Sequence, residues 1–142
     1  MSFCSTVFRA RGLEDILPDV RKFAGKHRKP YEAYINECVR HLKISRADAK
    51  QRLATMIARC DCTQYIEIHR LFKYRATYNE FIAVLQSRNI ELIRIFIDYG
   101  YPKYYPNEEA KKLLLMLISQ LEHSDLIVQL WERAELLPVA TN

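Results

Sequence analysis

The stretch NIELIRIFIDYG, residues 89 to 100, decides the fold of this chain. Seven of its first eleven side chains are apolar, and its charged residues, Glu91, Arg94 and Asp98, are spaced by three and four positions. That spacing places the charges along one narrow line of a helix, so the other sides have to be covered by protein. Stacked repeats cover their helices on both flanks in this way. We interpret the stretch as an inner helix of a stacked helical array.

The rest of the chain also follows helical spacing. Its 142 residues include only three glycines, and apolar and polar residues do not alternate as they would in a strand. We expect an all-α fold, a compact array of about eight short helices in antiparallel pairs. The expected helices begin near residues 15, 31, 45, 63, 78, 89, 107 and 124. The expected capping residues are Ser45, Thr63, Thr77, Asn89 and Asn107, with Gly100 as a left-handed helix end.

An internal similarity supports the stacking. The stretch HSDLIVQLWERA, from His123 to Ala134, repeats the opening stretch at an offset of 34 residues. The aligned pairs are Glu91 with Asp125, Leu92 with Leu126, Ile93 with Ile127, Phe96 with Leu130, Ile97 with Trp131 and Asp98 with Glu132. An offset of this size is typical of ankyrin and tetratricopeptide units. Because Trp131 aligns with Ile97, we expect its side chain in the core.

The stretch SRNIELIRIFIDYGYP resembles the second helix of an ankyrin repeat, in which a polar turn leads into an acidic and aliphatic helix closed by glycine. The resemblance covers residues 77–138, or two helix pairs. Thr77 stands at the family's opening Thr-Pro-Leu-His turn, followed by Tyr78, Asn79 and Glu80, and Gly100 is replaced by Ala134 in the later copy. The resemblance implies a protein-binding role. Degenerate arrays of this kind are common in large DNA viruses and intracellular parasites, which implies a viral or host-interaction protein.

Composition is consistent with one helical domain over residues 1–142, with a basic half over 1–76 that does not fit the repeat. Residues 1 to 79 carry 16 Lys/Arg against 8 Asp/Glu, and residues 80 to 142 carry 6 against 9, so +8 and −3 give the net +5. The four cysteines follow no secretory leader, so we expect reduced thiols and an intracellular location, cytoplasmic or nuclear. The longest apolar run, LLLMLI, is too short to span a membrane.

The loop YGYPKYYP, which follows the opening stretch, is the first candidate binding site. In an ankyrin-like array this loop reaches toward the next repeat, where exposed tyrosines would make good anchors for another protein. The alternative is that they fill the gap between repeats. The expected partner-binding residues are Tyr101, Lys103, Tyr104 and Tyr105.

The stretch RKFAGKHRKP is the strongest electrostatic feature. On a helix, its basic residues would cover one arc able to neutralise phosphates, although no aromatic side chain lies there to stack on a base. The alternative interpretation is a solvated basic face. His27 would lie on the apolar side as an interior imidazole. The candidate nucleic-acid-binding residues are Arg21, Lys22, Lys26, Arg28 and Lys29.

Catalytic and metal-binding patterns are weak. Cys38 with His41, and Cys60 with Cys62, have zinc-like spacing, but in a helical hairpin they would lie too far apart to share one ion. Cys62 and His69 are seven residues apart, roughly 10 Å along a helix, which is too far for a thiol–imidazole pair. We expect no enzyme activity, no metal and no cofactor.

Three hypotheses follow from the sequence. The first is a non-enzymatic module that docks another protein through the aromatic loop and an adjoining groove of the repeat. The second is a basic helical protein that binds RNA or DNA with little sequence specificity. The third is a homo-oligomer formed through the open end of the array, where Leu126, Leu130 and Leu136 have no later repeat to cover them.

Overall fold

A computed structural model describes residues 24–140 of the chain and confirms the all-α class. Within these residues there is no strand, and a single bridge pairs Tyr105 with Val139. The helix expected from Asp15 lies mostly outside the described residues. The helices are α3 (Pro30–Leu42), α4 (Arg46–Ile57), α5 (Cys62–Phe72), α6 (Tyr78–Gln86), α7 (Ile90–Tyr99), α8 (Glu108–Ser119) and α9 (Ser124–Leu136).

Helix starts are set by local capping. The side chains of Ser45, Thr77, Asn89 and Asn107 each accept a hydrogen bond from the backbone N–H three residues later, as expected. The cap expected at Thr63 is wrong. Asp61 caps α5 instead, because its carboxylate and the Gln64 amide satisfy each other's backbone N–H groups in a capping box.

Helix ends differ from the expectation for Gly100. Its φ of −146° is extended, so it is not the left-handed residue predicted there. Gly100 still donates its N–H to the carbonyl of Phe96, and the chain then runs on toward Tyr101. Between residues 24 and 140, the left-handed residues are Lys43, Lys73 and Arg88, which follow α3, α5 and α6.

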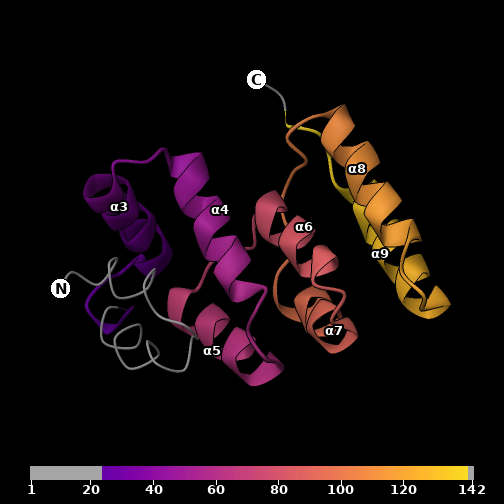
Figure 1. The fold of residues 1–142 in the computed structure, drawn as a ribbon, viewed down its shortest axis with the longest axis horizontal. Helices are drawn as coiled ribbons and strands as arrows, with labels where there is room; N and C mark the ends of the chain where they lie inside the picture. The colour runs from indigo at the N-terminus through magenta and orange to yellow at the C-terminus, as the bar shows by residue number, and fades with distance from the viewer. Residues whose placement is uncertain (1–23, 141–142) are drawn as a thin grey trace. The chain divides into compact units, whose positions relative to one another are not determined.

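The chain divides into two compact units, Met1–Tyr74 and Arg75–Asn142. In the first unit, α3 contacts both α4 and α5 (Figure 1). Its core contains an aromatic stack in which the Tyr31 and Tyr74 ring centroids are 4.2 Å apart. The fully buried large side chains of this core are Tyr34, Ile35, Leu53, Ile57, Tyr65, Ile68 and Phe72.

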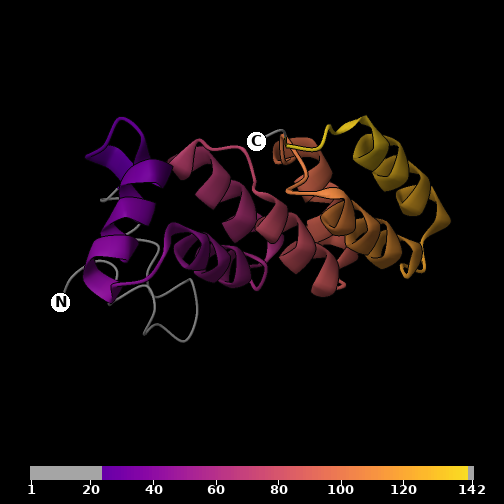
Figure 2. The same ribbon diagram turned by 90° about the horizontal axis from the view of Figure 1, so that it is seen from above.

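The second unit consists of two helix pairs. Contacts join α6 to α7, α8 to α9, and α6 to α8. The two views in Figures 1 and 2 show α8 and α9 side by side and antiparallel. The phenol of Tyr78 in α6 donates to the carbonyl of Ala110 in α8 at 3.0 Å, which links the first helices of the two pairs. The core residues of this unit include Phe81, Val84, Leu92, Ile93, Phe96, Leu114, Ile118, Leu126 and Leu130.

Candidate docking face on the last helix pair

The last helix pair is apolar on more than its inner side. In α9, Leu126 and Leu130 are fully buried against the core, whereas Val128 and Trp131 are 55% and 41% exposed. In α8, Leu113 and Met116 are also exposed. Within the described residues, five of the seven exposed large apolar side chains belong to this pair, so apolar exposure is concentrated there.

The second helices of the two pairs are tied together by polar contacts. The Arg94 guanidinium in α7 donates to the Asp125 carboxylate in α9 at 3.2 Å. The Arg133 guanidinium donates to the carbonyl of Ile97 at 3.0 Å and lies 5.6 Å from the Tyr101 ring centroid. The hydrogen bond from Arg94 holds the pKa of the Asp125 carboxyl below its ordinary value of 3.8. One side of α9 therefore faces α7.

The other side of α9 is left uncovered, as the aligned residues of α7 show. Ile93 and Ile97 are 0% and 7% exposed in α7, but their counterparts Ile127 and Trp131 are half-buried and 41% exposed. Residues that face inward in both helices, such as Leu126, keep the same burial. A flank that is buried in α7 is thus open in α9. The core position expected for Trp131 is wrong, because no later helix within the described residues covers it.

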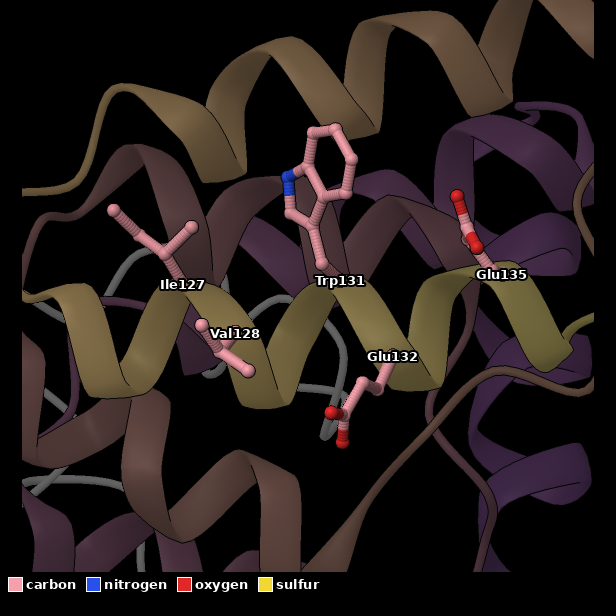
Figure 3. Close-up of a pocket in the computed structure, with 5 residues that line it drawn as sticks. All are labelled: Ile127, Val128, Trp131, Glu132 and Glu135. Carbon is pink, nitrogen blue, oxygen red and sulfur yellow. The ribbon is translucent and has the colours of Figure 1, made fainter.

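Five residues of α9 line a hollow of about 350 Å³ on this side, and we call them the open face: Ile127, Val128, Trp131, Glu132 and Glu135. In Figure 3, Ile127, Trp131 and Glu135 project from one side of the α9 ribbon, and Val128 and Glu132 from the other, with both carboxylates toward the end of the helix. Neither glutamate forms an ion pair with a described residue. Along α9, the apolar residues of the open face come first and its two glutamates come last.

The aromatic loop turns out to hold the unit together. Tyr105 is fully buried and its hydroxyl donates to the carbonyl of Ala134, so its predicted exposure is wrong. Its backbone also bonds to Pro138 and Ala140, which joins the loop to the segment after α9. Tyr101 is half-buried, with its ring 4.9 Å from that of Phe81, and burial raises the pKa of its hydroxyl.

Tyr104 and Lys103 are the exposed members of the predicted loop site. Tyr104 is 45% exposed, and the Lys103 ammonium lies 5.3 Å from its ring centroid. Tyr99 is the last residue of α7 and is 47% exposed. Tyr101 and Tyr105 contact residues of both helix pairs, which favours the alternative in which loop tyrosines fill the gap between repeats.

The predicted basic arc does not form on one helix. Arg21 and Lys22 lie outside the described residues. Lys26, Arg28 and Lys29 are exposed, but they follow Gly25, the last helical residue before Pro30. Glycine weakens a helix at Gly25, and Pro30 disfavours helical geometry at Lys29, so the segment between them does not favour a continuous helix. His27 is exposed here, so its predicted interior position is also wrong.

The cysteine and histidine patterns do not converge. Cys38 and Cys60 are buried core residues, as expected, and Cys62 is half-buried at the start of α5. His69 is 6% exposed, and its ring lies between those of Tyr65 and Tyr74, at 4.6 and 4.7 Å. In the part of the chain described, no group of three or more His, Cys, Asp or Glu side chains is arranged to hold a metal ion.

Leu126 and Leu130, predicted as part of an uncovered end, are fully buried, and only Leu136 of that set is exposed, at 81%. The open face instead uses Ile127, Val128 and Trp131. The internal alignment pairs Trp131 with Ile97 and so identifies equivalent positions in the two helices. It could not show that the position is covered in α7 and open in α9.

Protein-family models, curated proteins and solved structures were compared with the chain, and none matches it. Among residues 24–140, no helix is both long enough and apolar enough to cross a lipid bilayer.

Proposed function

We propose that this chain is a non-enzymatic protein–protein interaction module that works inside the cell, and that its second unit is a pair of ankyrin-like layers. The layered arrangement is supported by the matching burial of Leu92 and Leu126, and by the polar contacts of α9 with α7. An array of about eight helices in antiparallel pairs is part of this proposal.

The uncovered flank of α9 is the observation that carries this proposal. Apolar surface left in water costs about 25 cal/mol for each Å², and exposed apolar clusters with polar margins mark interaction sites in soluble proteins. Val128 and Trp131 supply such a cluster, with Glu132 and Glu135 beside it. Tryptophan at the centre of a docking surface is a frequent source of binding energy.

The aromatic loop has a second part in the proposal. Tyr101 and Tyr105 position the two helix pairs, while Tyr104 and Lys103 remain available to a partner. The proposed activity is binding without catalysis, metal or cofactor. Of the five side chains of the open face, two are carboxylates and none is a hydroxyl, thiol, amine or imidazole.

The alternative function is binding of RNA or DNA with little sequence specificity through the basic first unit. Exposed Lys26, Arg28 and Lys29 favour it. Other basic side chains of that unit are already engaged, since Arg40 pairs with Glu37 at 2.8 Å and Arg46 with Glu32 at 2.6 Å. Those ion pairs reduce the positive charge available to phosphates, so we place protein binding first.

The test uses the full chain as tagged bait in cells that express it naturally, with nuclease treatment before capture. The proposal predicts a defined protein that survives nuclease and is lost with Val128→Asp but kept with Arg28→Glu plus Lys29→Glu. Val128 is more than half exposed, so this substitution leaves the fold intact. Recovery of bulk nucleic acid, lost with the second variant and kept with the first, would replace this function with the alternative.

A further inference from the structure

We infer that the open face of α9 receives a basic amphipathic helix of a partner protein, an assignment that rests on the proposed function and specifies its ligand. The open face comprises Ile127, Val128, Trp131, Glu132 and Glu135. The shape of the ligand, its apolar stripe and its charge follow from three separate features of this face.

The first feature is the absence of backbone donors and acceptors on the face. Its residues all belong to one helix, Ser124–Leu136, whose backbone groups are bonded internally along most of its length. A partner segment that covers these apolar side chains therefore has to satisfy its own backbone hydrogen bonds, and a helix does so without help. An extended strand would need a sheet edge, which the open face does not offer.

The second feature is a template within the same unit. On α7, the flank formed by Ile93 and Ile97 is buried in the folded unit, where α9 contacts α7 through Asp125 and Arg133. The aligned flank of α9 has the same helical spacing, but Ile127 is only half-buried and Trp131 is 41% exposed. A helix bound there would extend the stacking by one layer.

The third feature is charge, which favours a different protein over a second copy of this chain as the ligand. Arg94 of α7 attracts Asp125 of the next layer, but its aligned residue in α9 is Val128. The charged groups of the open face are Glu132 and Glu135 alone, whereas Arg133 is directed to the Ile97 carbonyl. A second α9 would bring like charges together, so self-association through this face is disfavoured and lysine or arginine beside the apolar stripe is favoured.

The binding experiment uses the whole chain and a capped synthetic peptide of about 18 residues, long enough to form a helix, with leucine at helical spacing and lysine elsewhere. A matched peptide carries glutamate in place of lysine. Trp131 is the only tryptophan of the chain and lies in the open face, so its emission reports occupancy directly. We expect the lysine peptide to shift this emission to shorter wavelength in a saturable way and the glutamate peptide to leave it unchanged.

Variants locate the binding. Glu132→Lys with Glu135→Lys should lower the affinity for the lysine peptide about tenfold or more, since two exposed ion pairs become repulsive contacts. Glu91→Lys with Asp98→Lys makes the same change in net charge on α7, outside the open face, and should leave the affinity within about threefold. Raising the salt concentration from about 0.1 M to about 1 M shortens the Debye length from about 10 Å to about 3 Å. The affinity of the unmodified chain for the lysine peptide should fall as a result.

Three results would overturn the inference. They are equal binding of the two peptides, equal loss with the α7 control variant, and a dimer whose formation alone shifts the Trp131 emission. The proposed function is tested separately, by the capture of a partner protein from cells. If that partner is lost with Val128→Asp while the lysine peptide fails to bind, protein docking stands and the basic helical ligand is wrong.

Discussion

Tyr104 and Tyr105 are adjacent in the sequence, yet replacing each with alanine should affect stability very differently. Tyr105 is 0% exposed, whereas Tyr104 is 45% exposed. Truncating a buried aromatic side chain to alanine costs about 3 to 5 kcal/mol, because transfer energy is lost and a cavity remains. We expect Tyr105→Ala to lower the free energy of unfolding by this amount. Tyr104→Ala should change it by less than about 0.5 kcal/mol, as surface substitutions usually do.

The phenylalanine variant separates packing from hydrogen bonding. Tyr105→Phe keeps the ring and removes only the hydroxyl that donates to the Ala134 carbonyl. A hydrogen bond of this kind contributes about 0.5 to 1.5 kcal/mol. The Ala134 carbonyl also accepts from the Leu137 N–H at 3.3 Å, so it keeps one partner and the loss should fall near the lower end.

Urea unfolding followed by Trp131 fluorescence is the appropriate assay, because this single tryptophan lies in the same unit as both tyrosines. A shift of the midpoint without a change of slope would show that only stability has changed. The reasoning is refuted if Tyr104→Ala costs as much as Tyr105→Ala, or if Tyr105→Ala costs less than about 1 kcal/mol.

Three further outcomes are expected. Tyr101→Phe should raise the free energy of unfolding by about 1 kcal/mol in the urea assay, because the buried Tyr101 hydroxyl has no hydrogen-bond partner among the described residues; a loss of stability would contradict this. Burial raises the pKa of Tyr101 and Tyr105 above 10.0, so unit stability is complete below pH 10 and should fall as pH rises beyond it; a flat midpoint from pH 9 to pH 11 would disagree. Arg94→Ala should return the pKa of Asp125 toward 3.8 in an NMR titration, since the stabilising contact is present above 3.8 and is lost as pH falls through the lowered pKa; an unchanged Asp125 titration would mean that Arg94 is not its partner.

The helices and most of their starts could be predicted because their causes are local. Thr77 and Asn89 cap α6 and α7 through the N–H groups of Glu80 and Leu92, three residues away in each case. The error at Thr63 was also local, since Asp61 offers an equally good cap two residues earlier and gains a reciprocal bond from Gln64.

The roles of the loop tyrosines could not be read from the sequence. Tyr105 is buried because its partners, Ala134 and Pro138, approach from about 30 residues further along the chain. Tyr104 has the same side chain and adjacent position but no such partner, and nothing in YGYPKYYP distinguishes the two. Burial of a loop residue depends on which distant segment meets it.

The candidate site was missed for a related reason. Aligning Trp131 with Ile97 identified equivalent positions in two layers and predicted equal burial. Two helices with equivalent sequences can have different neighbours, however. Within the described residues, no helix packs on the side of α9 that faces away from α7. The same helical pattern therefore produces a core position in α7 and a docking surface in α9.

Cysteine alkylation at these two aligned positions tests the central claim most directly. Ile97→Cys and Trp131→Cys are each made in the full chain, and reaction with a maleimide is followed at that site by peptide mass. The thiol at position 131 should react more than about 100-fold faster than the thiol at position 97. A buried thiol reacts only after local unfolding, and a free energy of about 2.8 kcal/mol for that unfolding slows its reaction about 100-fold. Similar rates at the two positions would show that α7 and α9 are not a covered layer and an open one.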